Sequence, residues 1–67
     1  ENKSYIPQTG DIIFFDWNGD GHVQHVGIVE KVENGKVYTI EGNSKDEVRN
    51  KNYSLTNKSI YGYGFVN

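Results

Sequence analysis

The chain has 67 residues, no cysteine and a formal net charge of −2. A chain this short forms one domain with a small core, so without disulfides we expect a further segment or another chain to complete it. Its 34% hydrophobic content favours a folded domain over a disordered tail, while the lack of a basic cluster and of a long apolar run argues against nucleic-acid binding and a membrane span.

The first apolar run covers residues 11–17 and follows Pro7 and Gly10. Its aromatic and β-branched side chains occupy both parities, a pattern typical of a strand that is buried on both sides. The polar residues 18–21 then predict a turn, because asparagine, aspartate and glycine are the residues that turns favour.

A long strand over residues 22–33 and a second strand over residues 36–42 flank Asn34-Gly35, the dipeptide best suited to positive φ. This pattern predicts a central hairpin near residues 23–42. If the loop were Asn34-Gly35 alone, His25 and Glu41 would lie on opposite faces. If the loop also includes Glu33, Val32 lies opposite Lys36, and His25 faces the same side as Glu41.

We predict the three-residue loop, because it also gathers Val26, Ile28 and Ile40 on one face that we expect to be buried. In this register Asn43 lies directly opposite His25. Glu41 lies opposite Gly27 and therefore diagonal to His25.

The charged residues 45–52 predict either a loop or a loop followed by an edge strand that ends near Tyr53 and Leu55. Residues 60–66 alternate large and small side chains, as a strand does where another group approaches closely. No amphipathic helix is predicted. The fold class is therefore mainly antiparallel β, a small sheet or half-barrel built around the central hairpin.

His25, Glu41 and Asn43 are the candidate catalytic residues. A carboxylate or carboxamide beside an imidazole fixes its tautomer and orientation, and the other ring nitrogen can then activate a thiol or hydroxyl. A single histidine on a strand is more often structural, so position alone leaves both interpretations open.

Four motifs in order give stronger support for catalysis: GDIIFF at residues 10–15, HVGIV at 25–29, IEGNS at 40–44 and GYG at 62–64. Together they resemble the C-terminal half of CHAP domains, the cysteine- and histidine-dependent amidohydrolases and peptidases of cell-wall hydrolases. The resemblance spans nearly the whole chain, and it implies that residues 1–67 form the C-terminal β-sheet part of such a domain.

The resemblance implies an α+β, papain-like parent fold in which this chain supplies the β-sheet. It implies that His25 is the catalytic base, that Glu41 orients it and that Asn43 is a third polar group. The nucleophilic cysteine of the family lies in an N-terminal helical half, so these residues alone are expected to be inactive.

The implied parent enzyme is a peptidoglycan hydrolase, either an N-acetylmuramoyl-L-alanine amidase or a cell-wall peptide endopeptidase. Its partners are the peptidoglycan stem or cross-bridge peptide and the N-terminal half of the domain. It would act outside the cell or in the cell wall, and it requires no cofactor. The alternative function is a non-catalytic β module that binds cell-wall peptide, and exposed sheet edges also predict a homo-oligomer.

Asp16, Asn18 and Asp20 match the first half of a calcium-binding loop, but Gly27 occupies the position of its bidentate glutamate. The pattern predicts either a calcium site completed by other ligands or a polar Asx-type turn. The aromatic residues Trp17 and Tyr63 either line a binding groove or fill the core.

Overall fold

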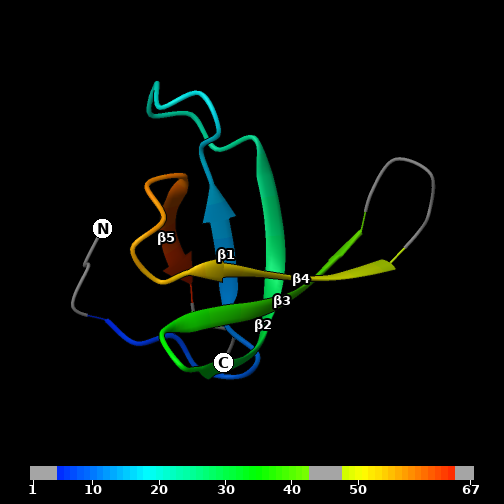
Figure 1. Cartoon of the computed structure of the whole chain (residues 1–67). Coiled ribbons are helices and arrows are strands. Elements are labelled where there is room, and N and C mark those ends of the chain that lie inside the picture. The colour runs from blue at the N-terminus through cyan, green and yellow to red at the C-terminus, as the bar shows by residue number, and fades with distance from the viewer. Residues whose placement is uncertain (1–4, 43–47, 65–67) are drawn as a thin grey trace.

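Five antiparallel strands form one sheet in the order β4-β3-β2-β1-β5 (Figure 1). The structure is a computed structural model that describes residues 5–42 and 48–64. The antiparallel β fold predicted from the sequence is confirmed, and the described residues contain no helix. It follows that none of them forms a helix able to cross a membrane. The strands are β1 (Ile12–Phe15), β2 (His25–Glu33), β3 (Lys36–Gly42), β4 (Val48–Ser54) and β5 (Ile60–Gly64).

The central hairpin joins β2 to β3 through the two residues Asn34 and Gly35, not through the predicted three-residue loop. Glu33 pairs with Lys36, and both loop residues have positive φ, 55° and 76°. These angles are those of a type I′ turn, which suits the right-handed twist of paired strands. The prediction of the loop was therefore wrong, because the strong turn preference of Asn-Gly decided it locally.

A β-bulge between Val29 and Lys31 nevertheless restores the predicted register at the far end of the hairpin. The extra residue shifts the pairing by one position, so that Ile28 lies opposite Ile40. His25 and Glu41 consequently share a face, as predicted. The physical cause is the bulge and not the length of the loop.

The buried face of the sheet is the one that carries the candidate site. Its fully buried apolar side chains come from β1, β2 and β3: Ile13, Phe15, Val29 and Val37. Because of the bulge, Val32 packs against this cluster together with side chains from β4, β5 and the segment between them.

The opposite face, which we predicted to be buried, is open. Val26, Ile28 and Ile40 are 49%, 44% and 38% exposed. The apolar side chains of β1 divide in the same way, since Ile12 and Phe14 are only partly buried. The expected burial of the first strand on both sides is therefore wrong, because no described segment covers this face.

The sheet is strongly curled, and β3 and β4 cross the direction of β1 and β5 in Figure 1. The ring centroids of Phe15 on β1 and Tyr53 on β4 lie 4.8 Å apart, although β2 and β3 separate these strands in the sheet. The curl therefore encloses the core as a half-barrel and brings the edge strand β4 over the site.

The two edge strands follow the sequence pattern. β4 confirms the predicted edge strand, although residues 45–47 of that charged segment lie outside the described residues. On β5 a Cβ atom at Gly64 would approach the Phe14 ring to 3.2 Å, which confirms the close approach expected from the alternating glycines.

Candidate active site

His25 is the first residue of β2 and lies beside Glu41 near the end of β3. The distance from His25 Nε2 to Glu41 Oε1 is 2.7 Å. The His25 side chain is 28% exposed, whereas the Glu41 side chain is only 4% exposed. The imidazole thus reaches solvent from one side while its carboxylate partner is held inside the half-barrel.

Two further groups donate hydrogen bonds to the second oxygen of the Glu41 carboxylate. Thr39 Oγ1 lies 2.6 Å and the Tyr53 hydroxyl 2.8 Å from Oε2. Burial by itself would raise the pKa of Glu41, but the hydrogen bonds from Thr39, Tyr53 and His25 outweigh it and hold the pKa below its ordinary value. Glu41 is therefore ionised at neutral pH.

The ionised carboxylate determines which nitrogen of His25 carries a proton. A carboxylate can only accept hydrogen bonds, so Nε2 carries the hydrogen that points to Glu41. In the neutral imidazole this leaves Nδ1 as a proton acceptor, and no described residue donates a hydrogen bond to it. The pair has the polarity of a general base held by its orienting group.

Aromatic rings enclose the imidazole on the side of the core. The His25 ring lies 5.7 Å from Phe15 and 6.0 Å from Trp17, measured between ring centroids. Trp17 stacks on Phe15 at 4.6 Å yet is 47% exposed. Trp17 therefore packs on the core through Phe15 and also forms an exposed wall beside His25. Both predicted roles, core residue and groove residue, apply to it in part.

A cavity of about 210 Å³ opens beside the pair. The described side chains and backbone that line it belong to the ends of β2 and β3 and to β4: His25, Glu41, Gly42, Arg49 and Lys51. A ligand in this cavity would touch the imidazole and the two cationic side chains.

Comparison with protein families matches the CHAP domain to residues 1–43. The match covers more than half of the 67 residues and includes both His25 and Glu41. The chain belongs to the CHAP domain family. No curated protein and no solved structure shows significant similarity to it.

Two of the three predicted site residues of this CHAP domain lie next to each other. His25 and Glu41 are in contact, whereas Asn43 lies outside the described residues. Thr39 and Tyr53 were missed. Thr39 carried a signal, since it lies two positions before Glu41 and so on the same face of one strand. Tyr53 carried none, because its pairing with Val37 depends on how the chain returns along β4.

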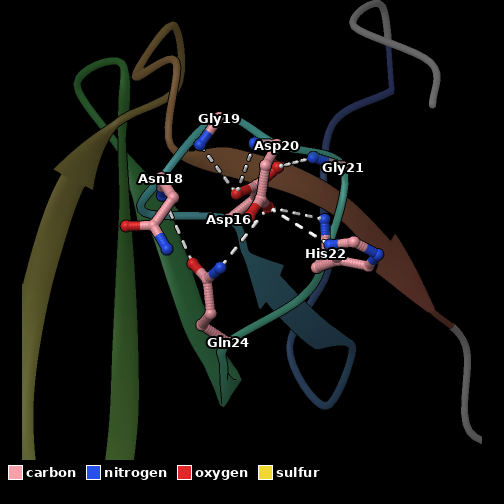
Figure 2. A network of polar contacts seen from close by, with 7 residues as sticks. All are labelled: Asp16, Asn18, Gly19, Asp20, Gly21, His22 and Gln24. Atoms are coloured by element: carbon pink, nitrogen blue, oxygen red, sulfur yellow. Dashed lines mark hydrogen bonds and ion pairs between the residues drawn. The ribbon is translucent and has the colours of Figure 1, made fainter.

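The calcium-like segment of this CHAP domain has the geometry of an Asx-type turn (Figure 2). The buried Asp16 carboxylate accepts hydrogen bonds from the backbone N–H groups of Gly19 at 2.8 Å and Gly21 at 2.7 Å, with a longer one from Asp20 at 3.3 Å. Burial opposes ionisation, but these donors outweigh it and lower the pKa of Asp16.

The oxygens of Asp16 therefore hold the turn that leads into β2. Asp20 accepts a hydrogen bond from the His22 backbone N–H at 3.0 Å. Among residues 5–42 and 48–64, no three His, Cys, Asp or Glu side chains are close enough together to hold a metal ion.

Tyr63 belongs to the core and not to the groove beside His25. It packs against the buried cluster from β5, and its ring lies 5.8 Å from Tyr5. Tyr63 also lines a separate cavity of about 210 Å³ together with Tyr5, Leu55 and Ile60, so both alternatives describe it in part.

Proposed function

We propose that this chain is the C-terminal half of a CHAP peptidoglycan hydrolase, an N-acetylmuramoyl-L-alanine amidase or a cell-wall peptide endopeptidase. His25 is its general base and Glu41 is the residue that positions the base. The observation that carries the proposal is the 2.7 Å contact between His25 Nε2 and a buried Glu41 that is held ionised by two hydroxyl donors.

The nucleophile in this proposal is a cysteine thiol outside residues 1–67, because the sequence contains no cysteine. His25 Nδ1 accepts the thiol proton, and the thiolate attacks the carbonyl carbon of a cell-wall amide bond. The imidazolium then donates its proton to the leaving amine as the C–N bond breaks. Water, deprotonated by His25, hydrolyses the thioester and restores the thiol. Asn43 is assigned to the same site as a third polar group.

Glu41 contributes by stabilising the imidazolium that forms in each step. Its negative charge lies against Nε2, and its own hydrogen bonds keep it from taking the proton. Burying the negative charge of Glu41 is unfavourable unless the carboxylate is fully paired. A histidine with only a structural role does not require a buried carboxylate of this kind beside it.

The second candidate function is a non-catalytic module that binds cell-wall peptide. The absence of cysteine from the sequence favours it, and so does the exposed Trp17, whose ring lies 6.0 Å from that of His25. Such a module would place the same peptide over His25 without cleaving it.

Hydrolysis of purified cell walls tests the choice between the two. The protein is produced with the upstream segment that carries the cysteine, and clearance is measured for the unaltered protein, His25→Ala and His22→Ala. His22→Ala is the matched control, because the His22 side chain is 85% exposed and lies only three positions away. We expect His25→Ala to lower the rate by at least about 10²-fold and His22→Ala to leave it unchanged.

Equal clearance by the unaltered protein and His25→Ala would contradict the hydrolase proposal. Absence of clearance by a folded unaltered protein that still binds cell walls would favour the binding module.

A further inference from the structure

Trp17 lies just after β1, and its indole ring is open to solvent on one face. The other face stacks on the fully buried Phe15, with 4.6 Å between the ring centroids and 12° between the ring planes. The rings of His25 and Tyr53 are nearer to Phe15, at 5.7 Å and 4.8 Å, than to the indole, at 6.0 Å and 6.2 Å. They therefore lie on the same side of the indole as Phe15. Because Trp17 is still 47% exposed, its opposite face is uncovered.

The backbone on either side of Trp17 is fixed by hydrogen bonds. The Asp16 N–H donates to the Ser59 carbonyl oxygen at 2.8 Å. The Asp16 carboxylate closes the turn that follows by accepting from the N–H groups of Gly19 at 2.8 Å and Gly21 at 2.7 Å. A ring that is held by its backbone and by stacking loses little conformational freedom when a ligand binds, so more of the contact energy contributes to affinity.

An exposed aromatic residue is common on protein surfaces and does not by itself indicate a ligand. The position of Trp17 argues for a further role, because its ring lies 6.0 Å from that of the proposed general base, His25. Trp17 does not line the cavity of about 210 Å³ at the His25–Glu41 pair. A substrate placed over His25 therefore meets two separate surfaces, the cavity and the open indole.

The polar side chains that follow Trp17 limit the chemistry of the ligand. Residues 18–21 contribute an amide at Asn18 and a carboxylate at Asp20, and no cationic side chain. Figure 2 shows the Asn18 amide pointing away from the turn, and this amide makes no hydrogen bond to any described residue. A flat apolar face with neutral and negative neighbours disfavours a carboxylate and suits a ring with C–H groups on its face and hydroxyl groups at its rim. A sugar ring has this chemistry.

The distance between the indole and His25 distinguishes the two proposed reactions. In the substrate of an N-acetylmuramoyl-L-alanine amidase, only a lactyl group separates the sugar from the scissile amide. With bonds of about 1.5 Å, the centre of the sugar ring lies about 5 Å from the carbonyl carbon. Each amino acid inserted between them would add up to about 3.5 Å. The 6.0 Å between the Trp17 and His25 rings therefore fits a sugar next to the scissile bond, which an amidase requires and an endopeptidase does not.

We infer that the open face of Trp17 binds the sugar ring next to the scissile bond and thereby directs cleavage to the sugar–peptide amide. The inference rests on the proposed function for the role of His25. C–H groups on one face of the sugar pack on the indole, and hydroxyl groups at its rim hydrogen-bond to side chains of the turn. Trp17 is thus a specificity-determining residue that takes no part in proton transfer.

Ligand binding to the 67-residue chain tests the inference without requiring catalysis. Trp17 is the only tryptophan in the sequence, so the fluorescence of the unaltered chain reports directly on this indole. The probes are N-acetylmuramyl-L-alanyl-D-isoglutamine and N-acetyl-L-alanyl-D-isoglutamine, which lacks the sugar. Titrations followed by NMR measure the affinities of Trp17→Ala, Trp17→Phe and Tyr61→Ala for both probes. Tyr61 is the matched control, because it is 45% exposed and lines a different cavity.

We expect the muramyl dipeptide to change the indole emission and to bind the unaltered chain at least about fivefold more tightly than the acetyl dipeptide. Trp17→Ala should remove this preference, and Tyr61→Ala should leave it unchanged. Trp17→Phe should keep part of it, since a smaller ring still offers a flat face. The fluorescence comparison requires no substitution, so it decides the question even if Trp17→Ala does not fold.

Equal binding of the two dipeptides, no detectable binding of either, or binding that leaves the indole emission unchanged would overturn the inference. So would a preference for the sugar that is the same in Trp17→Ala and Tyr61→Ala. These outcomes are separate from the cell-wall test. If His25→Ala abolishes clearance while the two dipeptides bind equally, the hydrolase stands and the sugar site fails. If a folded extended protein gives no clearance while the muramyl dipeptide is selected, the sugar site stands on a binding module.

Discussion

The side chain with the greatest influence on the candidate site is Glu41. Taking a carboxylate out of water is unfavourable, and the structure offsets this with three donors on its two oxygens. Of these donors, Thr39 lies on β3 like Glu41, and Tyr53 lies on β4, so its hydrogen bond links β4 to β3. The same contacts therefore orient His25 and hold the curled sheet together.

The ionisation of Glu41 predicts a dependence of stability on pH. Its pKa in the folded protein lies below the ordinary value of 4.5. The stabilisation from ionised Glu41 is therefore complete well above pH 4.5 and is lost as the pH falls through the lower folded value. We expect Glu41→Gln to lower the free energy of unfolding by about 1–3 kcal/mol at pH 7, and by less in acid. Urea unfolding between pH 7 and pH 3 measures both quantities.

Asp16 shows why the comparison with Glu41→Gln is needed. The pKa of Asp16 is also lowered, so acid destabilises the unaltered chain through both carboxylates. Only the part of the pH dependence that disappears in Glu41→Gln belongs to the site. A parallel pH dependence in the two proteins would show that Glu41 is not held ionised by its neighbours.

At the scale of elements, the hairpin combines a tight turn with a bulge. Asn34-Gly35 fixes the pairing next to the turn, and the bulge beyond Val29 shifts it for the rest of β2. The shift also brings Val32 onto the side of the core. The bulge places His25 and Glu41 on one face, which regular pairing from the two-residue turn would not do.

Gly27 provides a test of this close pairing. A Cβ atom at Gly27 would lie 2.9 Å from Glu41 Cγ and 3.4 Å from the Ile40 carbonyl oxygen. We expect Gly27→Ala to push Glu41 away from His25 and to lower the free energy of unfolding by about 1–3 kcal/mol. Thermal unfolding measures the loss of stability, and clearance of cell walls by the extended protein measures the loss of activity.

Gly42→Ala is the matched control for this change. Gly42 lies next to Glu41 at the end of β3, and a Cβ atom there would meet nothing within 4 Å. We expect Gly42→Ala to change the free energy of unfolding by less than about 0.5 kcal/mol. Equal effects of the two substitutions would contradict the close contact between Gly27 and Glu41.

At the scale of the whole molecule, the curl of the sheet makes the two faces unequal. The inner face holds the buried cluster and the candidate site, and the outer face leaves Val26, Ile28 and Ile40 open to solvent. An apolar surface of this kind is a normal place for a further segment or a second copy to pack. Whether a further segment or another chain completes the core, as expected for a chain of this length, stays a prediction.

The unequal faces predict unequal effects of truncation. Val37 is fully buried and Ile28 is 44% exposed. Although isoleucine loses more atoms, we expect Ile28→Ala to lower the free energy of unfolding by about 1 kcal/mol or less and Val37→Ala by about 2–3 kcal/mol. Urea unfolding of the chain at two protein concentrations measures both. A larger loss for Ile28→Ala at both concentrations would show that the outer face is covered.

The sequence by itself determined the elements that depend on neighbouring residues. Alternating side chains predicted the antiparallel strands, and Asn34-Gly35 predicted the hairpin. The meeting of His25 and Glu41 was also predicted, but from a three-residue loop that is not formed, and the β-bulge is what brings the two residues together. The strands and the hairpin follow from the period of a strand and from turn preference, which a local pattern contains. The ordered motifs likewise indicated the CHAP family.

Only the tertiary structure decided which face is buried and which residues complete the site. Val26, Ile28 and Ile40 are as apolar as Ile13, Val29 and Val37, so composition could not tell the inner face from the outer one. The curl and the bulge made that choice, because they depend on contacts between strands far apart in the chain. For the same reason the role of Tyr53 could not be predicted from the sequence. Its hydroxyl reaches Glu41 from the edge strand only because the sheet curls.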